Sequence, residues 1–237
     1  MWKLAGYSSI PIAALIVSGF LATMHTPGPV TRSAILHFAA GLVLAVVAVE
    51  FLPDLLHQHS AWVTALGFSL GTVAMLLIRA AAEPSEIAAE QGAGIPRALL
   101  FATGVDLIID GLMLGIGFAA GQKEGILLTV ALAIELAALG IATVATLTTR
   151  QISRGKILLI IAGLALLFGV SAVAGGLPLQ RLSGHAMAGV LAFGSAALLF
   201  LVTEELLIEA HEVPESPWLT ATFFLGFLVL LLLELLN

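Results

Sequence analysis

Long apolar blocks fill this chain, and short clusters of glycine, proline and charged residues separate them. A helix needs about 20 apolar residues to cross a bilayer, which is the usual length of these blocks. The pattern therefore predicts an all-α membrane protein with eight spanning helices in one transmembrane domain, residues 1–237. The expected helices cover approximately residues 5–24, 31–56, 61–81, 97–120, 125–148, 157–176, 185–210 and 218–236.

The composition supports an integral membrane protein embedded in a lipid bilayer. Apolar residues make up 60% of the chain and charged residues 10%, whereas a soluble domain carries about 25% charged residues. The net charge of −6 argues against a nucleic-acid partner, and the lack of cysteine excludes disulfides and thiolate metal sites. The first apolar block is long, and no small-x-small cleavage pattern follows it, so we interpret it as a span and not as a signal peptide.

Basic residues are divided unequally between the two sides of the predicted bundle. With eight spans both termini share one side, which carries Lys3, Lys123 and Arg181. The other side carries Arg32, Arg79, Arg97, Arg150, Arg154 and Lys156. Because cytoplasmic loops collect Lys and Arg, we expect both termini on the periplasmic or extracellular side of the cytoplasmic membrane.

Three acidic residues interrupt the fourth and fifth predicted spans near mid-depth. Asp106 and Asp110 are four residues apart and share one helix face, and Glu135 lies in the next span. A carboxylate in hydrocarbon costs on the order of 3 kcal/mol on insertion scales, so three acids need a partner, a proton, water or a metal. We predict that they bind a divalent metal ion at the place where it crosses the membrane. An all-oxygen set suits Mn²⁺, Fe²⁺ or Mg²⁺, and Zn²⁺ also accepts carboxylates.

Two other interpretations of these acids stay open. In the first, they are protonated and hydrogen-bond one helix to the next. In the second, they relay protons without any metal. A pair of acids on one face with a third on the adjacent helix favours the metal.

Polar clusters lie at the ends of the second and seventh predicted spans. Glu50, Asp54 and His57, followed by His59, form a candidate outer entrance for the metal. Glu204, Glu205, Glu209 and His211, followed by Glu212, form a candidate inner exit. A solvated helix end is the competing explanation for both clusters, although Glu50 lies deeper. His37 and His185 open their helices and are secondary candidates as metal ligands.

The same two spans suggest an inverted internal repeat. Glu50 precedes His57 by seven residues, and Glu204 precedes His211 by seven. Spans 2 and 7 of an eight-span chain run in opposite directions, and inverted repeats are typical of transporters.

These residues also carry a family resemblance. Phe38-Ala-Ala-Gly41, followed by Glu50-Phe-Leu-Pro53-Asp54, is similar to the "FAAG…HLLPE" helix of the ZIP (Zrt/Irt-like) divalent metal transporters. The stretch from Glu204 to His211 is similar to their "DELIPEAH" ending. Over most of its length the chain resembles the compact prokaryotic type. The resemblance implies a 3+2+3 arrangement with an inverted repeat of helices 1–3 and 6–8, a metal site on helices 4 and 5, and a homodimer.

The metal-site motifs depart from the family pattern. Helix 4 of the family reads H-N-x-P-E/D-G, where this chain has Asp106-Leu-Ile-Ile-Asp110-Gly111. Helix 5 of the family reads H/Q-E/D-x-P-E-G, where this chain has Glu135-Leu-Ala-Ala-Leu-Gly140. The glutamate that two-metal members place in helix 6 is missing. The comparison implies a single metal site, built from Asp106, Asp110 and Glu135, in helices that lack the family's prolines.

We therefore expect a transporter that moves a divalent cation inward by alternating access, with zinc, iron, manganese or cadmium as substrate and no organic cofactor. An enzyme is not expected, since there is no nucleophile constellation and no H-E-x-x-H pattern. The alternatives are a non-transporting ZIP-like sensor or scaffold, and a proton-coupled carrier of another solute.

Overall fold

The structure, a computed structural model, describes residues 2–25, 27–58, 60–89, 95–179, 182, 184–214 and 216–235. Every regular element within these ranges is a helix. Eight of the helical segments are long and apolar enough to cross a membrane. The prediction of an all-α protein with eight spans is therefore confirmed.

Six spans are single helices, and two contain a π-helical turn. The single helices are α1 (Trp2–Ala22), α4 (Ala61–Ala89), α5 (Arg97–Ala120), α6 (Gln122–Thr149), α7 (Arg154–Leu179) and α10 (Pro217–Leu235). The second span consists of α2 (Pro29–Val46), η1 (Val47–Phe51) and α3 (Leu52–His57). The seventh consists of α8 (His185–Leu201), η2 (Val202–Leu206) and α9 (Leu207–Ala210).

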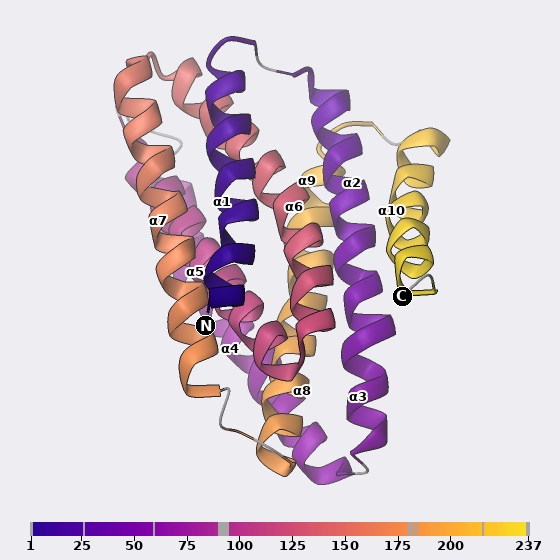
Figure 1. Cartoon of the computed structure of the whole chain (residues 1–237). Coiled ribbons are helices and arrows are strands. Elements are labelled where there is room, and N and C mark those ends of the chain that lie inside the picture. The colour runs from indigo at the N-terminus through magenta and orange to yellow at the C-terminus, as the bar shows by residue number, and fades with distance from the viewer. Residues whose placement is uncertain are drawn as a thin grey trace.

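Successive spans alternate in direction, so that α1 begins and α10 ends toward the same end of the bundle (Figure 1). We call this end the terminal face and the other end the opposite face. The start of α6 and the end of α3 also lie at the terminal face. The end of α9 and the start of α2 lie at the opposite face.

Helix α4 is longer than the sequence predicts. The apolar pattern predicts an end near residue 81, but the helix runs on to Ala89. The extension carries Glu and Ala, which are good helix formers, as well as Pro84, so the apolar pattern ends at a residue where the helix does not.

The π turns η1 and η2 occupy matching places in the second and seventh spans. Each has five residues, and in each the fourth is a glutamate, Glu50 in Val47–Phe51 and Glu205 in Val202–Leu206. A π turn inserts one residue into an α-helix, and such insertions are frequent at functional sites. Both glutamates therefore lie where their helices depart from regular geometry.

Glycine contacts support an inverted repeat on one side of the molecule. A Cβ atom on Gly226 of α10 would meet the Phe38 oxygen of α2 at 2.2 Å. A Cβ atom on Gly71 of α4 would meet the Phe193 oxygen of α8 at 2.6 Å. Phe193 follows Phe38 by the same number of residues as Gly226 follows Gly71. The pair of α4 and α8 therefore repeats the pair of α10 and α2.

The same register corrects the sequence alignment of the two halves. The spacing of seven residues matched Glu50 with Glu204, but the packing and the π turns match Glu50 with Glu205. Asp54 is then matched with Glu209, and the shared spacing to His57 and His211 is coincidental. The sequence pattern missed this register because adjacent glutamates offer two alignments, and only packing distinguishes them.

The central helices α5 and α6 follow the same relation between the two halves of the chain. Gly111 of α5 packs against Phe168 and Ser171 of α7, and Gly140 of α6 packs against Leu15 and Ser18 of α1. Asp106 precedes Gly111 by five residues, and Glu135 precedes Gly140 by five. Asp106 and Glu135 therefore occupy equivalent places in the two halves. These contacts support an inverted repeat, while the ZIP-specific 3+2+3 grouping stays a prediction.

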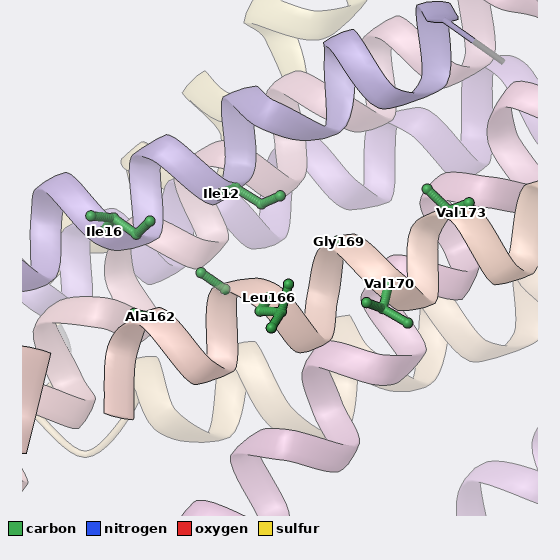
Figure 2. Close-up of a pocket in the computed structure, with 8 residues that line it drawn as sticks. Ile12, Ile16, Ala162, Leu166, Gly169, Val170 and Val173 are labelled. Carbon is green, nitrogen blue, oxygen red and sulfur yellow. The ribbon is translucent and has the colours of Figure 1, made fainter. Parts of the chain in front are cut away.

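The outer surface of the bundle is apolar. Large apolar side chains such as Trp62 and Leu159, which are 84% and 75% exposed, point away from the core on α4 and α7. Between α1 and α7 lies a groove lined by apolar residues and glycine, with Ile12 and Ile16 facing the α7 side chains (Figure 2). A groove of this composition suits lipid chains and offers no ligand for a cation. The candidate chemistry is confined to the interior and the ends of the bundle.

Candidate functional site

Three acidic side chains lie in the middle of the central helices. Asp110 on α5 and Glu135 on α6 are 0% and 3% exposed. Asp106 is half-buried, and its Oδ1 atom is fully covered. The close packing of Gly111 on α7 and of Gly140 on α1 holds both helices at this level.

Several oxygens of these acids have no hydrogen-bond partner among the described residues. They are both side-chain oxygens of Asp110, Oδ1 of Asp106 and Oε2 of Glu135. A buried polar atom left without a partner costs about 1–3 kcal/mol. Such a cost is expected where a site is built for a ligand and not for stability.

The three acids interact electrostatically with one another. Asp106 interacts with Asp110, Asp110 with Glu135, and Glu135 with Asp106. None of the interactions described for these three residues involves a basic side chain. The predicted transport-site residues thus lie in one electronegative region between α5 and α6.

A fourth acid, Glu205 of η2, joins this region. Its carboxyl group interacts with the carboxyl group of Asp106, and it interacts electrostatically with Asp110 and Glu135. The sequence placed Glu205 in the inner-exit cluster with Glu204. Neighbouring residues on a helix point to different faces, so the two adjacent glutamates had to separate, and this signal was available in the sequence.

Metal coordination is not preformed in the part of the chain that the structure describes. No group of three or more His, Asp or Glu side chains there has the geometry to hold a metal ion. Coordination would need the carboxylate oxygens to converge on one point at about 2.0–2.6 Å. The structure brings the four acids together as an electrostatic cluster, and a bound metal stays a prediction.

The predicted outer entrance is divided in the structure. Glu50 is buried, and its Oε1 lies 3.7 Å from Nζ of Lys123 at the start of α6. Lys123 also pairs with Glu234 near the end of α10, and the Glu50 and Glu234 carboxyl groups interact with each other. The sequence analysis gave no role to Glu234, and no local pattern connects residues so far apart in the chain.

The remaining entrance residues interact with their own helix or lie apart from Glu50. Asp54 is half-buried, and the exposed His57 bonds the Pro53 oxygen through Nδ1 at 2.8 Å. His59 lies outside the described residues. Of this predicted set, the structure therefore brings only Glu50 into a buried ionic cluster.

The predicted inner exit is likewise distributed over separate contacts. Glu204 pairs with Arg79 of α4, and Glu209 pairs with Arg32 of α2. The His211 ring lies edge-on to the His37 ring, with centroids 5.1 Å apart. These ion pairs tie the seventh span to its neighbours and favour a structural role for Glu204 and Glu209.

The secondary histidine candidates differ in environment. His37 is buried, and its Nδ1 bonds the Ser33 oxygen at 2.9 Å, while His185 is exposed at the start of α8. Neither is among the groups described as interacting with the central acids.

Comparison with known protein families and with curated proteins finds no match for this chain.

Proposed function

We propose that this chain is a ZIP-like transporter that carries a divalent cation, such as Zn²⁺, Fe²⁺, Mn²⁺ or Cd²⁺, across the cytoplasmic membrane. The observation that carries the proposal is the cluster of Asp106, Asp110, Glu135 and Glu205 at the centre of an eight-span bundle. Several oxygens of Asp106, Asp110 and Glu135 are buried without a hydrogen-bond partner, and the interactions described for these three acids include no basic counter-ion. A structural network of this depth would be expected to satisfy its own polar atoms.

The charge of the cluster suits a divalent cation. Four carboxyl groups can release several protons, and a divalent ion can replace two positive charges without adding net charge to the hydrocarbon. Asp106, Asp110 and Glu135 would be ligands from two helices, and Glu205 would add a ligand from a third.

The relation between the two halves supports alternating access. Glu205 and Glu50 occupy equivalent places, yet Glu205 reaches the central acids and Glu50 is held by Lys123. Equivalent elements in different environments are the expected state of an inverted-repeat transporter that has closed one side. The distribution of Lys and Arg favours the terminal face as the outside, and the path on Glu50's side would then be closed to the outside. Inward movement of the cation is part of the proposal. A homodimer is expected from the ZIP resemblance.

The test is cation uptake by the purified chain in sealed liposomes. Mn²⁺, Fe²⁺, Zn²⁺, Cd²⁺ and Mg²⁺ are offered outside, and uptake is measured for the native chain and for Asp110→Asn. Glu212→Gln, which changes an exposed acid beyond α9, is the matched control. Loss of a central ligand should reduce flux by tenfold or more, since even supporting residues of metal sites are worth about 10–100-fold.

Each outcome bears on a different part of the proposal. Flux of at least one cation that Asp110→Asn abolishes and Glu212→Gln preserves supports transport through the cluster. Absence of flux for all five cations contradicts the transporter and favours a sensor or scaffold. Proton release without cation uptake favours the proton-coupled carrier of another solute.

A further inference from the structure

The ionic cluster of Lys123, Glu50 and Glu234 joins three spans at the terminal face. It brings together the first turn of α6, the π turn η1 and the end of α10. The side chain of Glu50 is 7% exposed and that of Glu234 is 19% exposed, while the side chain of Lys123 is 44% exposed. The lysine therefore reaches from the surface toward acids that are covered by the protein.

The cluster holds one cationic group between two acidic side chains. The Lys123 ammonium pairs with both Glu50 and Glu234. A divalent cation would neutralise two carboxylates at this place if the ammonium moved aside. One Oε atom of each glutamate is buried without a hydrogen-bond partner, which leaves oxygens available for such an ion.

Buried apolar residues of α6 separate Lys123 from the central acids. Lys123, Leu127, Ala131 and Glu135 follow one another at intervals of four residues, so they form one inclined stripe that turns by about 120° around α6. Lys123 and Glu135 are twelve residues apart, which corresponds to ~18 Å along the helix. Leu127 and Ala131, which separate them, are 3% and 0% exposed. No polar residue of this stripe connects the terminal face with the central acids.

We propose that Glu50 and Glu234 form an outer cation-binding site which Lys123 occupies as a tethered cation, and that Lys123 thereby keeps the terminal face closed. Release of the ammonium frees Glu50 and Glu234 for a divalent cation and loosens the contact of α6 with η1 and α10. Glu50 can then approach Glu135, as its equivalent Glu205 approaches Asp106. The inference rests on the proposed transport function, because a gate has a use only if something passes.

The gate can be tested without measuring transport. The chain has no cysteine, so Ala131→Cys places one thiol on the α6 stripe between the lysine and the central acids. A membrane-impermeant maleimide is applied to sealed vesicles from the side of the terminal face. The single thiols His57→Cys at the terminal face and Ser153→Cys at the opposite face, both exposed, identify the orientation of the chain.

Labelling of Ala131→Cys should be slow with Lys123 present and about tenfold faster with Lys123→Met, as expected when a minor open state becomes a major one. Lys123→Arg, which keeps the charge, should stay slow. Lys123→Gln serves as a second neutral variant in case Lys123→Met does not fold, and folding is checked by gel filtration. Equal labelling rates for the native residue and both neutral variants would overturn the gate.

The binding site is tested by equilibrium dialysis of the purified full chain against Mn²⁺. Lys123→Met should bind one more Mn²⁺ per chain than the native protein, and adding Glu50→Gln should remove it. Unchanged Mn²⁺ stoichiometry would overturn the site. Because neither readout needs flux, failure of the gate is distinct from failure of the transporter, which the uptake assay decides alone.

Discussion

Replacement of Asp110 by leucine should make the protein more stable and inactive at once. The change is suggested by the chain itself, because the equivalent position on α6, one residue before Gly140, is Leu139. Asp110 is fully buried, and neither of its carboxylate oxygens has a hydrogen-bond partner in the described structure. A leucine removes both unsatisfied atoms and fills the space with an apolar side chain.

The magnitude follows from the two oxygens. Each unsatisfied buried atom costs about 1–3 kcal/mol, so removing both is worth ~2–6 kcal/mol. The leucine side chain is larger than that of aspartate, and crowding offsets about 1–3 kcal/mol of this gain. A net gain of about 2 kcal/mol remains, and for a chain of this size it raises the melting temperature by about 4–8 °C.

The assay is thermal unfolding of the purified protein in detergent without divalent cations, at one fixed scan rate. Asp110→Asn is the matched control, since it keeps the shape and the polar atoms and should gain much less. Asp110→Val serves as a smaller apolar variant where leucine does not fit. Mn²⁺ at 100 times its dissociation constant should add about 2.7 kcal/mol to the native protein and nothing to the leucine variant.

Two results would refute this reasoning. If both Asp110→Leu and Asp110→Val melt below the native protein, the carboxyl group is a satisfied structural element and not an unfilled ligand. If Mn²⁺ stabilises the leucine variant as much as the native protein, the cation binds elsewhere.

Two further predictions concern neighbouring residues and helix packing. Glu205→Gln should reduce cation uptake by tenfold or more, comparable to loss of a metal-site residue. Glu204→Gln removes an exposed ion pair with Arg79 that is worth about 0–1 kcal/mol, so it should leave uptake within about twofold. Equal effects of the two variants in the uptake assay would contradict the placement of Glu205. Gly226→Ala should destabilise the folded chain by about 1–3 kcal/mol, because its Cβ would meet a backbone oxygen of α2. Gly163→Ala should leave the stability unchanged, because nothing lies within 4 Å of its Cβ position. Thermal melts that show no difference between these two variants would contradict the packing of α10 on α2.

The eight spans could be predicted because bilayer thickness sets the length of an apolar helix, and the apolar blocks of the sequence have this length. The central placement of Asp110 and Glu135 followed from the same argument. Gly111 and Gly140, in the middle of the central spans, contact neighbouring helices. What each glycine contacts depends on the packing of helices far apart in the chain.

The π turns and the role of Glu205 could not be predicted in this way. A π turn adds one residue without changing the apolar pattern, so residues 31–56 and 185–210 read as unbroken helices. The extra residue determines which of the adjacent acids points inward. The same limit applies to Lys123, whose partner Glu234 is more than a hundred residues away in the chain.

The position of a bound cation tests the central claim most directly. Crystals of the full chain are soaked with Mn²⁺ at the concentration that saturates uptake, and the anomalous scattering of manganese locates the ion. The proposed function predicts a peak between α5 and α6 within coordination distance of Asp110 and Glu135, and its loss in Asp110→Asn. Manganese peaks confined to the surface, with none among the four central acids, would contradict it.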